Sequence, residues 1–218
     1  MRRCKSLLYA GGAVHFMLLY QHFVMAKCVQ QQQPTVQGKE EKMTHYTTQM
    51  DAARHGIITP QMEIVAEKEH FDVDELRELI AKGQVIIPCN KNHKCISPSG
   101  VGAKLTTKIN VNLGVSRDWK DVDMEYEKVH SAVEMGAEAI MDLSSYGDTR
   151  SFRRKLTSEC PAMIGTVPIY DAVVYYHKAL GKITSEEWID IVRMHAEDGV
   201  DFMTIHCGMN RATAARFK

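Results

Sequence analysis

The amino-acid sequence predicts an α/β protein whose parallel β-sheet is covered by helices. From residue 101 onward, short apolar segments alternate with segments of helical periodicity, and this order is typical of parallel sheets. The composition, with 44% hydrophobic and 25% charged residues, is that of a folded globular domain. A doubly wound sheet and a (β/α)8 barrel both fit this pattern. A barrel needs roughly 200 to 250 residues, and this chain supplies about four of its eight strands.

A small, mainly helical lead-in region is expected over residues 43–100. Thr59 is suited to cap a helix that starts with Pro60, because the first helical position does not need a backbone N–H. Asp72 is suited to cap a second helix, which ends where Gly83 can adopt a left-handed conformation. Residues 85–87 then predict a short strand that ends at Pro88.

Residues 101–218 are expected to form the sheet and its helices. Strands are predicted over 105–113, 139–143, 163–170 and 200–206. Helices are predicted from residue 122 to Gly136, over 148–159, from a capping box of Thr184 and Glu187 to Gly199, and over 210–217.

Residues 1–42 differ in character from the rest of the chain. A basic start is followed by an apolar run over 7–26 and a glutamine tract over 30–33. Because His15, Gln21 and His22 interrupt the run and no small-residue cleavage site follows it, a signal peptide and a spanning helix are both weak interpretations. We favour a third interpretation, in which translation begins at Met43 and residues 1–42 are an unrelated or disordered leader.

The charge balance and the cysteines narrow the class of function. The 27 Lys and Arg residues are balanced by 27 Asp and Glu residues, which argues against a nucleic-acid or membrane partner. Six irregularly spaced cysteines do not form a disulfide framework, so a cytoplasmic protein with reduced thiols is expected. Cys89, His93 and Cys95 lie close in sequence, but their spacing fits no common zinc or iron–sulfur motif.

Four residues near the carboxyl ends of the predicted strands are candidate ligand contacts: Asn112, Met141, Tyr170 and His206. Ligands of both candidate architectures bind at this edge of the sheet. Alternation along the strand turns Asp142 away from Met141, so we expect a structural role for that carboxylate.

Each of the four residue types suits recognition of a small heterocycle. An Asn amide offers a paired donor and acceptor, and Met offers a soft apolar wall. A Tyr ring packs on a heterocycle, while His bonds or transfers a proton near neutral pH. Each also has an ordinary structural role, as a turn Asn, a core Met, a half-buried Tyr or a hydrogen-bonded His.

A basic run lies on the predicted helix over 148–159 and comprises Arg150, Arg153, Arg154 and Lys155. We expect a solvated helix face there rather than a phosphate clamp.

Several separate stretches resemble one enzyme family and occur in its order. They are Thr-Thr-Gln-Met (47–50), Gly-Ile-Ile-Thr-Pro (56–60), Ile-Ile-Pro-Cys-Asn-Lys-Asn-His (86–93), Lys-Ile-Asn-Val-Asn-Leu-Gly (108–114), Ala-Ile-Met-Asp-Leu-Ser (139–144), Gly-Thr-Val-Pro-Ile-Tyr (165–170) and Asp-Phe-Met-Thr-Ile-His-Cys-Gly (201–208). Together they resemble the front of the phosphomethylpyrimidine synthase family, over residues 43–218. Ordered matches of this kind are far more specific than one short motif.

The resemblance implies a radical S-adenosylmethionine (SAM) lyase of thiamine biosynthesis with a central (β/α)8 TIM barrel. Such an enzyme converts 5-aminoimidazole ribonucleotide to 4-amino-5-hydroxymethyl-2-methylpyrimidine phosphate. The family's substrate contacts carry over to Asn112, Met141, Tyr170 and His206, and no catalytic residue is assigned. The resemblance also implies a homodimer at full length.

The family's cofactor ligands do not carry over to this chain. Its 4Fe-4S iron-sulfur cluster is held by a Cys-x2-Cys-x4-Cys motif, which this sequence lacks. We therefore expect the cluster, SAM and zinc ligands to lie beyond residue 218, and an inactive fragment containing the first half of the barrel over 101–218. The alternatives are a non-catalytic α/β nucleotide-binding module and one half of a split enzyme.

Overall fold

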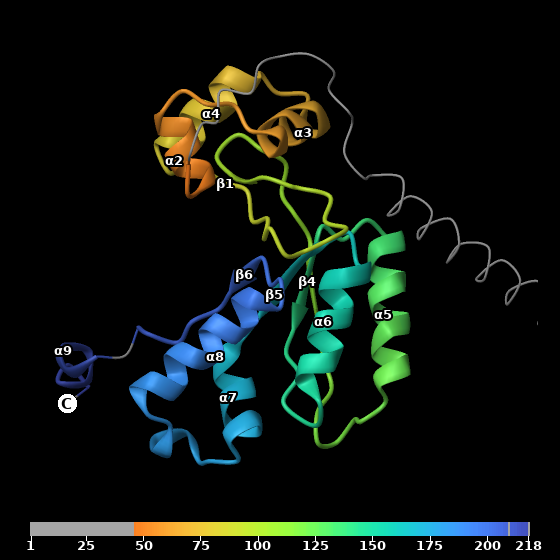
Figure 1. The fold of residues 1–218 in the computed structure, drawn as a ribbon, viewed down its shortest axis with the longest axis vertical. Helices are drawn as coiled ribbons and strands as arrows, with labels where there is room; N and C mark the ends of the chain where they lie inside the picture. The colour runs from red at the N-terminus through yellow and green to blue at the C-terminus, as the bar shows by residue number, and fades with distance from the viewer. Residues whose placement is uncertain (1–45, 209, 218) are drawn as a thin grey trace, which may run out of the picture. The chain divides into compact units, whose positions relative to one another are not determined.

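The computed structural model describes residues 46–208 and 210–217 (Figure 1). The interpretation of residues 1–42 concerns a segment outside these described residues. Among the described residues, no helix is both long and apolar enough to cross a membrane.

The lead-in region contains α2 (Gln49–Arg54), α3 (Pro60–Glu69), α4 (Val73–Ala81), β1 (Val85–Ile86) and β2 (Val101–Gly102). Both predicted caps are confirmed. The Thr59 hydroxyl accepts the Met62 N–H at 3.3 Å, and an Asp72 carboxylate oxygen accepts the Glu75 N–H at 2.8 Å. Gly83 adopts a left-handed φ of 71°. Helix α2 and the antiparallel pairing of β1 with β2 were not predicted from the sequence.

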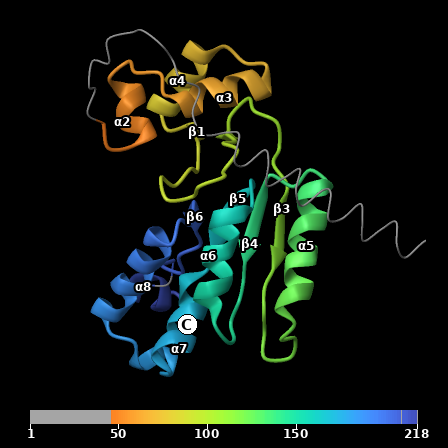
Figure 2. The ribbon, with the colours of Figure 1, turned by 45° about the vertical axis from the view of Figure 1, so that its right-hand side comes forward.

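The central sheet is parallel throughout, as predicted. Its strands are β3 (Asn110–Leu113), β4 (Ala139–Asp142), β5 (Met163–Thr166) and β6 (Phe202–Met203), hydrogen-bonded in that order. The helices α5 (Val122–Glu134), α6 (Thr149–Glu159), α8 (Ser185–Glu197) and α9 (Arg211–Ala214) correspond to the four predicted helices. Figure 2 shows β3 and β4 side by side, with α5 next to β3.

One face of the sheet is packed by α5 and α6. Val129 and Ala132 of α5 and Phe152 and Leu156 of α6 form one buried cluster with Ile140 and Ile164 of the sheet. Such burial of strands beneath helices is what an alternating β/α sequence requires.

Two predicted strands are shorter than expected. The strand predicted over 105–113 begins only at Asn110, because the preceding residues bond to α3 instead of the sheet. The Thr106 N–H donates to Glu69 Oε2 at 2.9 Å, and Lys108 forms an ion pair with the same carboxylate. The strand predicted over 200–206 is limited to Phe202–Met203, so His206 follows the strand rather than lying in it.

The prediction of a strand over 163–170 is wrong in its second half. β5 ends at Thr166, and α7 (Pro168–Tyr176) begins after a single intervening residue. Pro168 occupies the first turn of α7, where its fixed φ favours a helix and its missing N–H costs nothing. Tyr170 is therefore helical.

α7 packs against α8, the helix that returns to β6 (Figure 1). Ala172 of α7 lies in a buried cluster with Ile191 and Met194 of α8. The short helix η1 (Leu180–Lys182) lies between them in the chain. The predicted capping box of Thr184 and Glu187 is confirmed at the start of α8.

Candidate functional site

Asn112 and Met141 are neighbours across two strands near the carboxyl edge of the sheet. They are register partners in β3 and β4, and the same row continues through Gly165 of β5 to Phe202 of β6. Residues in register on adjacent parallel strands point to the same face of the sheet. This face therefore presents an exposed amide beside a thioether that is 8% exposed.

The Phe202 ring lies directly over Gly165 of this row. A Cβ atom at Gly165 would lie 2.3 Å from the Phe202 ring, which is too close for a real contact. The absence of a side chain at Gly165 thus lets the ring lie across β5. Amide, thioether and aromatic ring form a surface suited to a flat, partly polar ligand.

Tyr170 and His206 form a second pair at the same edge. Their ring centroids lie 6.2 Å apart and their planes are tilted by 44°. Tyr170 is 41% exposed and His206 is also exposed, so both rings remain accessible. Within the described residues, no hydrogen bond or ring contact joins this pair to Asn112 or Met141.

The loops that follow β3 and β4 contact each other closely. Gly114 has a φ of 144°, and a Cβ atom there would lie 2.5 Å from the backbone nitrogen of Ser144. Buried Glu125 accepts the Gly114 N–H at 2.9 Å, and the Ser144 hydroxyl accepts the Val115 N–H at 3.0 Å. These contacts join the loops that follow the carboxyl ends of β3 and β4.

Asp142 closes the turn after β4. One of its carboxylate oxygens accepts the Ser144 N–H at 2.9 Å. Burial raises the pKa of Asp142 to about 6, with the hydrogen bonds from Ser144 and the charge of Arg153 opposing the rise. These contacts fit the structural role expected for this carboxylate.

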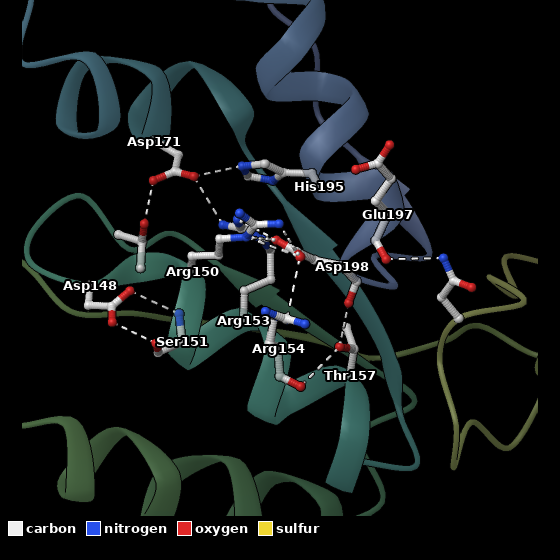
Figure 3. Close-up of polar contacts among 12 residues, drawn as sticks. Asp148, Arg150, Ser151, Arg153, Arg154, Thr157, Asp171, His195, Glu197 and Asp198 are labelled. Atoms are coloured by element: carbon white, nitrogen blue, oxygen red, sulfur yellow. Dashed lines mark hydrogen bonds and ion pairs between the residues drawn. The ribbon is translucent and has the colours of Figure 1, made fainter.

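The basic run on α6 is only partly solvated: Arg154 and Lys155 are exposed, whereas Arg153 is buried. Figure 3 shows the contacts of the three arginines of this run. The Arg153 side chain is 1% exposed and donates to Asp171 at 3.1 Å and to Asp198 at 2.9 Å. Arg150 also donates to Asp198, at 3.0 Å, and Arg154 lies 3.6 Å from it. The prediction therefore holds for Arg154 and Lys155 but is wrong for Arg153, whose carboxylate partners Asp171 and Asp198 lie far away in sequence.

Asp171 and His195 complete this buried network. His195 Nε2 lies 2.9 Å from Asp171, and its Nδ1 lies 2.9 Å from the Thr166 hydroxyl. Burial alone raises the pKa of Asp171, but the hydrogen bonds from His195 and Thr149 outweigh it and lower that pKa. Burial lowers the pKa of His195. Neither residue was predicted to belong to a site.

An open groove of about 770 Å³ is lined by Arg117 and Tyr146, from the loops that follow β3 and β4, and by Val173, His177 and Lys178, from α7 and the residues after it. None of the four candidate residues lines it. The groove therefore shares no residue with the row of Asn112, Met141, Gly165 and Phe202.

Comparison with known proteins assigns the chain to a family. The model of the radical SAM ThiC family matches residues 48–218. The chain belongs to this family. It is 63% identical over 174 residues to the phosphomethylpyrimidine synthase of Clostridioides difficile, covering 80% of this chain and 40% of that protein.

Two further relatives give similar values. The phosphomethylpyrimidine synthase of Alkaliphilus oremlandii is 63% identical over 173 residues, covering 79% of this chain and 40% of the relative. That of Clostridium novyi is 63% identical over 174 residues, covering 80% and 40%. The chain thus spans about 40% of the length of these curated relatives of the radical SAM ThiC family.

The segment from Cys89 to Cys95, which carries part of the family resemblance, makes contacts within the protein. His93 Nδ1 lies 2.7 Å from Asp201 Oδ2, and its Nε2 lies 2.7 Å from the Cys160 carbonyl oxygen. Asn90 donates to the carbonyls of Ala196 and Val200, both at 2.8 Å. This segment therefore joins the amino ends of β5 and β6.

The described residues of this radical SAM ThiC family member do not fit a metal or an iron–sulfur cluster. Over 46–208 and 210–217, no group of three or more His, Cys, Asp or Glu side chains is arranged to hold a metal ion. Burial raises the pKa of Cys89 to about 11, which keeps its thiol protonated, whereas metal ligation needs the thiolate. Ligation by Cys89 would therefore require the loss of a proton that burial holds in place.

Proposed function

We propose that this chain carries part of the substrate site of a phosphomethylpyrimidine synthase, a lyase of thiamine biosynthesis. In this proposal, Asn112, Met141, Tyr170 and His206 bind 5-aminoimidazole ribonucleotide. The proposal rests chiefly on the pairing of Asn112 with Met141 at the carboxyl edge of a parallel sheet, in a chain 63% identical to enzymes of that name. Ligands of α/β proteins characteristically bind at this edge.

The proposal includes the architecture. We propose that the four parallel strands are the first half of a (β/α)8 barrel over residues 101–218, preceded by a lead-in region over 43–100 and an unrelated leader over 1–42. The strand order β3-β4-β5-β6, in which each strand pairs with the next one along the chain, supports a barrel over a doubly wound sheet. A doubly wound sheet reverses its strand order at a switch point.

Each contact has a distinct task in this proposal. Asn112 accepts a hydrogen bond from the Asn110 amide at 3.2 Å, which orients its own amide donors toward a heterocycle or amino group. Met141 supplies an apolar wall that offers a reactive intermediate no exchangeable hydrogen. Tyr170 and His206 present two accessible rings for the imidazole and polar atoms for the ribose phosphate. No catalytic residue is proposed.

The cofactors of the proposed reaction are SAM, a 4Fe-4S cluster and zinc. We propose that their sites are formed by the part of the relatives' length that this chain does not span. We also propose that the full-length protein is a homodimer and is located in the cytoplasm.

Calorimetric titration of the chain with 5-aminoimidazole ribonucleotide tests the site. Tyr170→Ala is expected to weaken binding at least tenfold, which corresponds to about 1.4 kcal/mol. Tyr175→Ala is the matched control, because Tyr175 is exposed on the same helix but is not among the proposed contacts. His206→Asn removes the second ring and is also expected to weaken binding. His130→Asn is its control, because His130 is an exposed histidine of α5.

Two outcomes contradict the proposal. One is equal weakening by Tyr170→Ala and Tyr175→Ala, and the other is no binding of the ribonucleotide by the unaltered chain. Equal affinity for adenosine monophosphate favours the non-catalytic nucleotide-binding module instead.

A further inference from the structure

The imidazole of His195 joins two points of the chain that flank Tyr170. Its Nδ1 lies 2.9 Å from the hydroxyl of Thr166, the last residue of β5. Its Nε2 lies 2.9 Å from a carboxylate oxygen of Asp171, in the first turn of α7. Tyr170 lies between these two attachment points, so His195 spans the turn that presents it.

The start of α7 has no side-chain cap of its own. Val167 occupies the N-cap position, and no side chain there accepts a hydrogen bond from the helix. The Tyr170 N–H donates to the Val167 carbonyl at 3.0 Å. Because uncapped helix ends fray, the orientation of this turn depends on contacts made by its flanking residues.

Those contacts are chiefly buried hydrogen bonds to the carboxylate of Asp171. Asp171 accepts hydrogen bonds from Thr149 and Arg153 of α6 as well as from His195 of α8. Figure 3 shows Asp171 facing both His195 and Arg153. The first turn of α7 is thus tied to both neighbouring helices, while the Tyr170 ring on the same turn remains accessible.

The hydrogen-bond pattern is satisfied by a neutral imidazole with its proton on Nε2. Nε2–H then donates to Asp171, and the Thr166 hydroxyl donates to Nδ1. His195 is only 2% exposed, and burial lowers its pKa, which agrees with the neutral form. One imidazole thereby fixes the end of a strand and the start of a helix.

We propose that His195 is a positioning residue that holds Tyr170 in its binding orientation by bridging Thr166 and Asp171. The link from Tyr170 to a ligand rests on the proposed function, whereas the bridge itself rests on the geometry alone. His195 does not touch the ligand in this proposal.

Amide hydrogen exchange of the full chain tests the bridge without any ligand. His195→Leu is expected to speed exchange of the Tyr170 amide at least tenfold, while amides of α5 such as that of Val129 stay unchanged. Thr166→Val, which removes one hydrogen bond with little change in volume, is expected to speed the same amide to a smaller extent. This second variant keeps the test valid where His195→Leu fails to fold.

Arg150→Met is the matched control for the exchange experiment. It removes hydrogen bonds from the same network, but they lead to Asp198 and not to α7. The Tyr170 amide should therefore exchange as in the unaltered chain. The proposal is overturned when Arg150→Met speeds this amide as much as Thr166→Val does, or when the His195 and Thr166 variants speed all amides equally.

A double-mutant cycle with 5-aminoimidazole ribonucleotide tests the link to binding. Thr166→Val is expected to weaken binding in the presence of Tyr170 and to have little effect when Tyr170 is already alanine. A purely structural role predicts the same fold-loss in both backgrounds, and that result overturns the positioning role. Failure of the unaltered chain to bind the ribonucleotide refutes the proposed function, whereas the exchange experiment still decides whether the bridge exists.

Discussion

Replacing Arg153 with methionine tests the buried network of Figure 3 most directly. The guanidinium donates to Asp171 at 3.1 Å and to Asp198 at 2.9 and 3.3 Å. Removing one partner of a buried ion pair costs about 3–5 kcal/mol, because the remaining charge stays buried without compensation. Asp198 keeps Arg150 and Asp171 keeps His195, so we expect a loss near the lower limit, about 3 kcal/mol.

Thermal unfolding followed by circular dichroism measures this loss. For a domain of this size, about 3 kcal/mol lowers Tm by about 6–12 °C. Arg154→Met is the matched control, because Arg154 is the next residue and is 66% exposed, with Asp198 3.6 Å away. Because the Arg154 guanidinium is exposed and lies too far from Asp198 for a hydrogen bond, its loss should cost about 0.5 kcal/mol or less and change Tm by about 2 °C at most.

Equal Tm values for Arg153→Met and Arg154→Met would refute the reasoning. That result would mean that the three hydrogen bonds of Arg153 only balance the cost of burying its charge. The prediction of a solvated basic face would then describe the energetics correctly, although not the geometry.

Substitutions at Asp142 and at two glycines have defined outcomes. The pKa of Asp142 is raised by burial to about 6, above the 3.8 of an exposed carboxyl, so the free energy of unfolding falls as pH rises from about 4 to about 6. Asp142→Asn should remove this fall, so the free energy of unfolding of the variant minus that of the unaltered chain should be larger at pH 7 than at pH 4 by roughly 2–3 kcal/mol. Urea unfolding of both proteins at both pH values measures this difference, and equal values at the two pH values would contradict the prediction. Gly114→Ala should cost more than about 2 kcal/mol, because φ is positive and the new Cβ meets the backbone of Ser144. Gly181→Ala should be close to neutral, because the added Cβ atom would meet no atom within 4 Å beyond its chain neighbours. Equal Tm losses for the two glycine variants would contradict the argument.

Helices with caps were predictable from the sequence because their signals are local. Thr59, Asp72 and Thr184 each lie at the N-cap, and the hydrogen bonds that they accept come from residues three positions later. The parallel sheet was predictable for a related reason, since alternating strands and helices have few ways to bury their apolar faces. Neither inference requires knowledge of distant contacts.

The helical position of Tyr170 shows where local reasoning failed. Residues 163–170 are largely apolar, and a short apolar run fits a strand or a buried helix equally well. Pro168 was the available signal, because proline is disfavoured inside a central strand and favoured in the first turn of a helix. Ala172 and Tyr176, four residues apart, then continue one helical face toward α8.

Burial of Arg153 also left a signal in the sequence. The buried positions of α6 are Thr149, Phe152, Arg153, Leu156 and Thr157, which follow helical spacing. Arg153 therefore lies within the stripe that faces the protein rather than on the opposite face. Its partners Asp171 and Asp198 lie 18 and 45 residues away, and no local pattern identifies them.

Two histidines that are buried among the described residues, His93 and His195, lie at opposite edges of the sheet. At the amino edge, His93 bonds Asp201, which also accepts the Ile164 N–H of β5 at 2.7 Å. Residues 89–95 cover this edge, and the side chains of Asn90, Asn92 and His93 bond to the protein itself. At the carboxyl edge, His195 holds the turn after β5, while the rings of Tyr170 and His206 stay accessible. Substitution of His93 should therefore lower Tm without changing the affinity for the ribonucleotide in calorimetric titration, whereas substitution of His195 should lower both.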